Sequence, residues 1–110
     1  MRTRGDQAEQ QAQRYLCQQG LRWVASNVRS RFGEIDLIMQ DQQCLVFIEV
    51  KFRQNNHFGG AISAVTPTKQ RKIHQTALWY LQQQGTLDIP CRFDVVAITG
   101  EHIHWLKNVF

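Results

Sequence analysis

The chain has 110 residues, few cysteines, few prolines and no long apolar run. Its apolar runs, such as 45–48, are strand-sized, whereas a membrane helix needs about 20 apolar residues. The two N-terminal arginines have no apolar stretch behind them, so the pattern of a secretory signal is absent. The 3 cysteines form no CxxC pair, which disfavours a zinc knuckle and a disulfide framework. We therefore expect a cytoplasmic protein without a membrane partner, whose reduced cysteines act as small core hydrophobes.

Acidic side chains are the scarcer charged class, with 9 Asp and Glu against 13 Lys and Arg and a formal net charge of +4. Four of the acids lie on or beside apolar segments of the first half: Glu9, Glu34, Asp36 and Glu49. The rest of the chain is correspondingly basic, as in proteins that neutralise phosphates and release their counterions. A positive charge that only aids solubility is the alternative. The candidates for nucleic-acid contact are Arg31, Arg53, Lys69, Arg71 and Lys72.

The length and the 43% hydrophobic content suit one domain over residues 1–110. Helical periodicity spans 6–19, ending at Gly20, and a second helix starts at Thr66-Pro67 and ends at Gly85. Strand patterns cover 21–29, 34–39, 44–52, 92–99 and 102–106, and residues 54–64 have the composition of a flexible loop. The order α-β-β-β-α-β-β predicts an α/β fold with a mixed central sheet flanked by helices.

Two consecutive predicted strands carry charges where apolar residues are expected. Alternation puts Glu34 and Asp36 on one face of the first strand, and Glu49 and Lys51 on one face of the second. A turn centred between residues 41 and 42 would set Glu34 opposite Glu49, and would make Asp36 and Glu49 diagonal neighbours on the same face. A slip of one residue would separate the two carboxylates, so the hypothesis depends on the register.

Carboxylates held close together and partly buried repel each other unless a cation compensates them. Mg²⁺ (or Mn²⁺) binds one or two carboxylates, waters and substrate phosphate oxygens, and Lys51 could orient a water or neutralise charge on the phosphate. Asp36, Glu49 and Lys51 therefore suit hydrolysis of a phosphodiester. The alternative is an ion pair within the sheet, in which Asp36 or Glu34 meets Lys51 on a solvated face.

Several other residues have both a functional and a structural interpretation. Lys69, Arg71 and Lys72 begin the second helix, whose free N–H groups and dipole favour anions, but they could equally be solvated charges. Asp94 interrupts an apolar strand, where an ion pair with Arg92 is the simpler explanation. His102 and His104 lack a third ligand nearby for zinc. The aromatic side chains predicted to belong to the core rather than to stack on bases are Phe52, Trp23, Trp79 and Trp105.

Three motifs resemble the bacterial YraN-like family: Asn27-x-Arg29, Gly33-Glu34-Ile35-Asp36-Leu37-Ile38 and Phe47-Ile48-Glu49-Val50-Lys51-x-Arg53. The spacing of Asp36, Glu49 and Lys51 is similar to that of the PD-(D/E)xK restriction-endonuclease-like superfamily, although the proline before the first acid is absent. The likeness extends over nearly the whole chain, to Gly5, Ala8, Glu9, Ala12, Lys69, Arg92, Phe93 and Asp94. Members of the family are small cytoplasmic proteins similar to archaeal Holliday-junction resolvases.

The resemblance implies a role for each matching residue. Asp36, Glu49 and the Val50 carbonyl would hold the metal, Lys51 would be the catalytic lysine, and Glu34 would support the site. Glu9 matches a helix glutamate that reaches toward the metal and takes part in catalysis, although a solvated helix residue is an equal alternative. The implied function is a Mg²⁺- or Mn²⁺-dependent endonuclease acting on DNA, branched DNA above all, possible as a homodimer with two sites. The rival hypotheses are a non-catalytic nucleic-acid-binding or adaptor module with the same fold and, last, a plain structural subunit.

Overall fold

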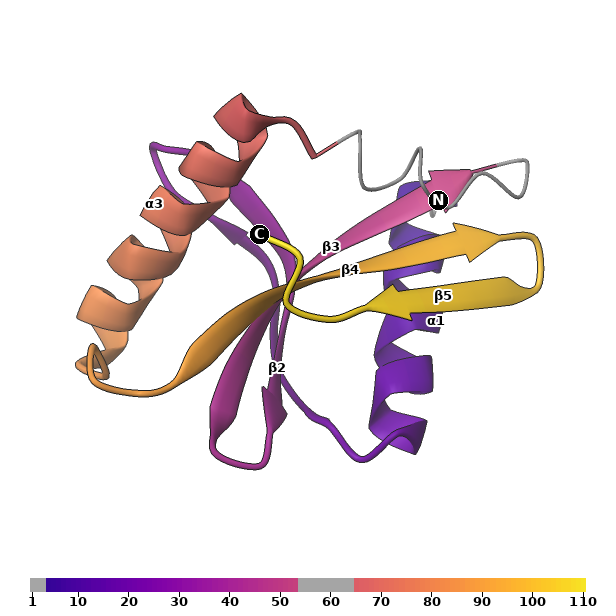
Figure 1. The fold of residues 1–110 in the computed structure, drawn as a ribbon, viewed down its shortest axis with the longest axis horizontal. Helices are drawn as coiled ribbons and strands as arrows, with labels where there is room; N and C mark the ends of the chain where they lie inside the picture. The colour runs from indigo at the N-terminus through magenta and orange to yellow at the C-terminus, as the bar shows by residue number, and fades with distance from the viewer. Residues whose placement is uncertain (1–3, 54–64) are drawn as a thin grey trace.

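The computed structural model describes residues 4–53 and 65–110, so the predicted loop at 54–64 lies outside the described residues. Its helices are α1 (Arg4–Gln18) and α3 (Pro67–Gln84) (Figure 1). Its strands are β1 (Arg22–Arg29), β2 (Glu34–Asp41), β3 (Cys44–Arg53), β4 (Cys91–Thr99) and β5 (His102–Leu106). The strands form one sheet in the order β1-β2-β3-β4-β5, antiparallel except for the parallel β3–β4 pair. The predicted α/β class, mixed sheet and element order are confirmed.

The two helices cover opposite faces of this sheet, as Figure 1 shows. Ala8, Ala12 and Leu16 recur at helical spacing and bury one face of α1 against the sheet. On the other face, Ile73, Ala77 and Leu81 of α3 do the same. The central strand β3 is buried on both faces, so its apolar run supplies both cores.

Alternation along β3 decides which face each of its side chains reaches. Val46 and Ile48 pack into the α1-side core, whereas Leu45 and Phe47 pack into the α3-side core. Glu49 and Lys51 continue the second series, so these charges belong to the face that α3 covers. This face was predicted to hold a site, and the helix on it carries Lys69 and Lys72.

Helix α3 begins and ends at the residues that the sequence predicts. The Thr66 hydroxyl accepts a hydrogen bond from the Lys69 N–H, and Pro67 occupies the first helical position. Gly85 ends the helix in the left-handed conformation, with φ of 69°, and its N–H donates back to the last turn. The start of α3 is therefore fixed in place, which matters because its first turn borders the site.

The β2–β3 register differs from the predicted one by two residues. The turn is at Gln42-Gln43, and Leu37 pairs with Ile48. The centre of the turn therefore lies one residue later than predicted. If the observed register continued, Asp36 would lie directly opposite Glu49 rather than Phe47. Because the shift is two residues and side chains alternate with period two, the prediction that both carboxylates share a face survives.

Two predictions about buried residues are wrong. Cys17 and Cys91 are exposed and Cys44 is only half-buried, because Cys17 lies one position beyond the buried stripe of α1 and Cys91 begins a strand. Trp23 is 50% exposed, because it lies on the edge strand β1 and its indole donates to the nearby Ser26 hydroxyl. In the described ranges, no helix is both long and apolar enough to cross a membrane.

Candidate active site

A hollow of about 420 Å³ lies where β2 begins, β3 ends and α3 starts. Three carboxylate residues and three lysines line it, together with Gly33, Val50 and Ile73. The lining residues are Gly33, Glu34, Asp36, Glu49, Val50, Lys51, Lys69, Lys72 and Ile73. The sequence predicted a functional role for seven of these nine residues, so the tertiary structure gathers most of the predicted site in one place.

Asp36 occupies the point where β2 separates from β3. The β2–β3 pairing ends at Leu37 and Ile48. If the pairing continued for two more residues, Val50 would lie opposite Ile35. Instead, the Val50 N–H donates to Asp36 Oδ2 at 2.8 Å. A side chain thus replaces the missing backbone partner, since a buried N–H without an acceptor is costly. This hydrogen bond fixes the Asp36 carboxylate beside β3.

Glu49 is almost completely buried, with 7% of its surface exposed. Its Oε2 lies 4.0 Å from Lys51 Nζ, and its Oε1 has no hydrogen-bond partner within the described residues. A buried carboxylate oxygen without a partner is unusual because desolvation strongly penalises the charged form. Glu49 lines the hollow, so a cation bound there beside this buried oxygen would supply the missing partner.

The electrostatics of the hollow reflect this burial. Burial and the neighbouring Asp36 charge raise the pKa of Glu49 to about 8. Burial likewise raises the pKa of Asp36, against the opposing effects of the Val50 N–H and Lys51. Burial lowers the pKa of Lys51, and the adjacent Lys69 ammonium lowers it further. Each shift disfavours the charged form, as expected where the groups of the described residues compensate the carboxylate pair only in part.

The first turn of α3 brings lysines to the carboxylates, and Gly33 makes this approach possible. A Cβ at Gly33 would lie 3.2 Å from the Lys72 Cβ and 3.6 Å from the Thr76 hydroxyl, so any larger residue would push α3 away. Lys69 and Lys72 line the hollow at i and i+3 spacing. Arg71 instead donates to the Thr68 hydroxyl at 3.2 Å and is not among the lining residues.

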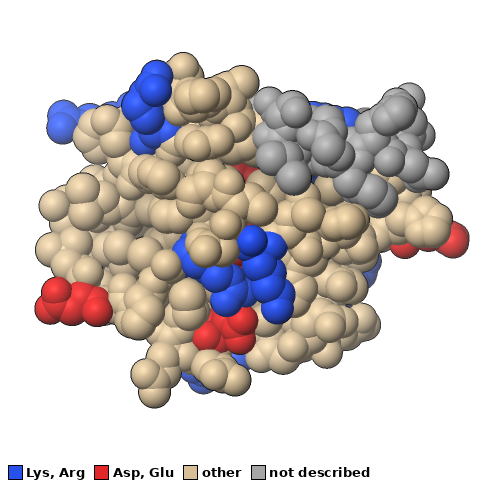
Figure 2. Space-filling view, viewed as in Figure 1, with Lys and Arg blue, Asp and Glu red and all other residues tan. Residues whose placement is uncertain are grey.

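The other predicted contact residues have local partners. Arg31 lies over the Phe32 ring at 4.8 Å, and Arg53 donates to the Phe52 carbonyl at 3.0 Å. On the face shown in Figure 2, the Lys and Arg side chains of the described residues form separate small groups rather than one continuous surface. That face therefore offers a nucleic acid local contacts and no broad basic surface.

Glu34 and Glu9 lie at the margins of the site. Glu34 lines the hollow, but its half-exposed carboxylate lies 3.4 Å from Arg29. Glu9 lines a neighbouring hollow of about 260 Å³ between α1 and β1. There the Asn27 amide donates to both Glu9 oxygens at 3.0 and 3.1 Å. Burial, followed by the charge of Asp36, raises the pKa of Glu9 to about 7.

Asn27 and Gly33 contribute to the candidate site, although the sequence patterns predicted no role for them. Asn27 has φ of 52°, a conformation that Asn tolerates better than most residues, in a strand where Asn is otherwise disfavoured. An Asn within an alternating apolar segment was the available signal. Gly33 appeared in the sequence analysis only as the first residue of a family motif, and no local pattern could have shown that α3 packs against it.

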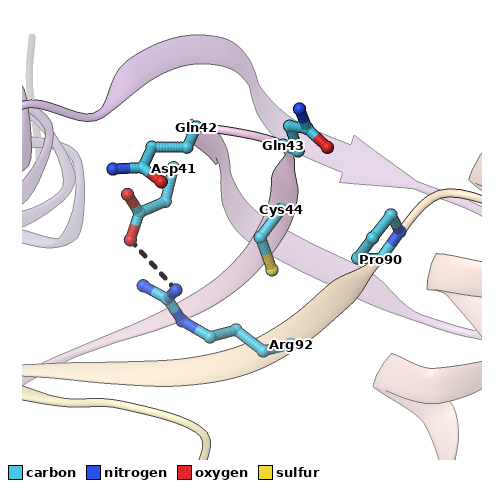
Figure 3. Close-up of a pocket in the computed structure, with 6 residues that line it drawn as sticks. All are labelled: Asp41, Gln42, Gln43, Cys44, Pro90 and Arg92. Atoms are coloured by element: carbon cyan, nitrogen blue, oxygen red, sulfur yellow. Dashed lines mark ion pairs between the residues drawn. The ribbon is translucent and has the colours of Figure 1, made fainter.

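A second hollow, of about 520 Å³, lies at the β2–β3 turn, and Figure 3 shows the residues that line it. Arg92 pairs there with Asp41 at 3.0 Å and with the fully buried Asp94 at 3.1 Å. Asp94 also accepts hydrogen bonds from the Trp105 indole and the Asn108 N–H. Two carboxylates thus pair with Nη1 and Nε of one guanidinium, and the predicted ion pair of Asp94 with Arg92 is confirmed.

The carboxylates that line the hollow are Glu34, Asp36 and Glu49, and Val50 lines it as well. Across residues 4–53 and 65–110, no three His, Cys, Asp or Glu side chains lie close enough together to hold an ion. Mg²⁺ needs only one or two carboxylates, with waters and phosphate oxygens completing its shell. The partnerless Glu49 Oε1 beside Asp36 therefore fits such an ion without help from Glu9.

The mixed sheet and its hollow define a small α/β protein with an acid–acid–lysine site. The chain belongs to the uncharacterised protein family UPF0102, whose family model matches residues 8–98. It is 56% identical over 108 residues to a UPF0102 protein of Enterobacter sp. (strain 638), covering 96% of this chain and 82% of the relative.

Two further relatives agree with this membership. A UPF0102 protein of Shewanella sp. (strain ANA-3) is 55% identical, covering 98% of this chain and 99% of the relative. The UPF0102 protein YraN of Escherichia fergusonii is 51% identical, covering 96% and 82%. The predicted YraN-like family is confirmed.

Proposed function

We propose that this protein is a divalent-metal-dependent endonuclease of the PD-(D/E)xK type that hydrolyses DNA phosphodiesters, with branched DNA as its preferred substrate. The observation that carries the proposal is the buried Glu49 Oε1, which has no hydrogen-bond partner among the described residues, on a side chain that lines the same hollow as Asp36. A structural role for these acids would require a cation of the chain against each carboxylate. Lys51, at 4.0 Å, is a weak substitute.

Each residue of the hollow has a part in the proposed reaction. Asp36 and Glu49, with the Val50 carbonyl, would hold Mg²⁺ or Mn²⁺, which when bound activates water and stabilises charge on the phosphate. The Val50 N–H keeps the Asp36 carboxylate oriented. Lys51, whose side chain is 14% exposed, would hold the attacking water or a phosphate oxygen by donating its protons. Glu34, at the rim of the hollow, would orient waters. Glu9 would take part in catalysis from the neighbouring hollow that it lines, as the resemblance implies.

The substrate would be held mainly through its backbone. Arg31 lies two residues before Gly33, and Arg53 two residues after Lys51, so both flank the hollow along the chain. Phosphate contacts of this kind give affinity without sequence selection. The resemblance to junction resolvases suggests that the protein selects its target by shape. Contacts to backbone phosphates are sufficient for such selection.

The test is cleavage of a fluorescently labelled four-way DNA junction by the purified full-length protein with Mg²⁺ or Mn²⁺. We expect Glu49→Ala and Lys51→Ala to lower the cleavage rate by about 10² or more, because each removes a contact to the reacting phosphate or its ion. Both variants should still bind the junction in Ca²⁺. Arg14→Ala, which removes an exposed charge from α1 on the opposite face of the sheet, is the control.

Junction binding without cleavage by the wild-type protein would overturn the nuclease proposal and favour a non-catalytic binding module. Equal cleavage by wild type and Glu49→Ala would also overturn it, because activity would then come from another site or a contaminant. Calorimetric titration with Mn²⁺ supplies an independent readout, in which Asp36→Ala should abolish the binding heat.

A further inference from the structure

The hollow contains a second pair of like charges, which faces the carboxylate pair. Lys69, from α3, and Lys51, from β3, line the same hollow, and the nearby Lys69 charge lowers the pKa of Lys51. In the described part of the chain, Lys69 forms no ion pair with a carboxylate, although Asp36 and Glu49 line the same hollow. Two ammonium groups side by side repel each other as two carboxylates do, and an anion between them removes the repulsion.

The backbone at the start of α3 contributes little to anion binding. Pro67 has no N–H, and the Lys69 N–H already donates to the Thr66 hydroxyl. The expected anion site made of free N–H groups is therefore largely occupied by the helix cap, which corrects the prediction for this helix start. Any anion held here must be bound chiefly by the lysine side chains, aided by the helix dipole.

The position of the lysines is set by packing rather than by chance. Lys72 approaches the Gly33 backbone so closely that even one added methyl group would lie 3.2 Å from its Cβ. This contact, with the Ser30–Thr76 hydroxyl hydrogen bond of 2.8 Å, ties the first half of α3 to the start of β2. Lys69, one turn earlier on the same face of α3, is thereby held over the end of β3.

We infer that Lys51 and Lys69 together form a phosphate-binding site, in which Lys69 holds a non-bridging oxygen of the scissile DNA phosphate while Lys72 contacts the phosphate next to it. The inference rests on the proposed function, since it names the substrate contact of the same hollow. It separates Lys69 and Lys72 from Arg71, which begins the same helix but contacts Thr68 outside the hollow. The ligand class is the nucleic-acid backbone phosphodiester.

The experiment compares Lys69→Ala and Lys69→Arg with the wild type and with Arg14→Ala. Binding of the labelled junction is measured by anisotropy in EDTA over a salt series, and single-turnover cleavage is measured with Mg²⁺. For Lys69→Ala we expect a salt dependence lower by about one phosphate contact and cleavage slowed at least about tenfold. Lys69→Arg should recover most of the binding, and Arg14→Ala should match the wild type in both measurements.

An unchanged salt dependence in Lys69→Ala would overturn the inference, as would cleavage at the wild-type rate while Lys51→Ala is inactive. Because Lys69 is exposed and Ala favours helices, the variant should fold, and its melting curve checks this. If the wild type cleaves no DNA, the proposed nuclease fails. The salt series in EDTA still decides whether Lys69 binds phosphate, so the two failures are distinguishable.

Discussion

At the scale of single residues, the carboxylates removed from solvent differ in how well their charge is compensated. Glu49 is buried and Asp36 is half-buried, and burial raises the pKa values of both carboxyl groups. Asp94 is fully buried but accepts hydrogen bonds from three groups. The contrast separates a carboxylate that stabilises the fold from a pair that the fold tolerates for another purpose.

The first prediction concerns Glu49→Gln in metal-free buffer. Because the folded pKa of about 8 lies above the ordinary value of 4.5, the charged form costs stability progressively as pH rises from about 4.5 to 8. The wild type should therefore lose stability between pH 5.5 and pH 8, and Glu49→Gln should lose less, ending more stable by on the order of 1 kcal/mol. Thermal melting in EDTA at both pH values measures the difference. Glu101→Gln, in the exposed β4–β5 turn, should behave like the wild type.

The second prediction concerns Asp94→Ala. The change removes the acceptor for Arg92, the Trp105 indole and the Asn108 N–H at once, and leaves a largely buried guanidinium with one partner. The free energy of unfolding should fall by about 3–5 kcal/mol, as for other broken buried pairs. Urea denaturation measures it, with the exposed Asp88→Ala as the matched control. A loss below about 1 kcal/mol would contradict the structural role.

At the scale of the elements, the site depends on how helix and strand ends are terminated. Strand β2 leaves β3 at Asp36, and the side chain of that residue takes over the backbone hydrogen bond. Helix α3 begins after the capping residue Thr66, and it packs closely against Gly33 at the start of β2. These ends, rather than the regular middle sections, determine the width of the hollow.

The third prediction concerns the end of α3. Gly85 has φ of 69°, and no atom lies near the Cβ that a substitution would add, so conformational strain alone sets the cost. Gly85→Ala should lower the free energy of unfolding by about 1 kcal/mol, and Gly85→Asn by less, because Asn visits the left-handed region more readily. Equal losses in the two variants, measured by urea denaturation, would contradict this explanation.

At the scale of the whole molecule, the fold brings two charged surfaces together from opposite directions. The sheet supplies the carboxylates and Lys51, and α3 supplies Lys69 and Lys72. A ligand that binds only the complete hollow must stabilise the entire fold, because the hollow exists only when α3 is docked on the sheet.

The fourth prediction is thus a metal-dependent melting temperature. At about 100 times its dissociation constant, Mn²⁺ should stabilise the protein by about 2.7 kcal/mol. For a domain of this size that corresponds to a rise in Tm of about 10 °C or more. Asp36→Asn should remove most of the rise, whereas Asp88→Asn, in the exposed turn after α3, should keep it. No rise in the wild type at millimolar Mn²⁺ would contradict a two-carboxylate site.

Local patterns in the sequence determined most of the fold. Periods of 2 and 3.6, the Thr66-Pro67 start and the Gly20 and Gly85 stops depend on neighbouring residues only, so they predicted the element order and the shared face of Asp36 and Glu49. The same alternation predicted that Lys51 shares a face with Glu49, and the family motifs implied that it is the catalytic lysine. Position along an element and side-chain alternation are thus properties that a single sequence exposes.

Only the tertiary structure decided what depends on distant segments. The β2–β3 register was displaced by two residues because turn geometry, not alternation, sets it. Lys69 meets Lys51, and Gly33 admits Lys72, through the docking of α3, which no local pattern encodes. Glu9 lies in its own hollow beside Asn27, because packing of α1 across the sheet fixed its position. Contacts between residues far apart in the chain arise from the packing of whole elements. That packing determines which residues line the candidate site.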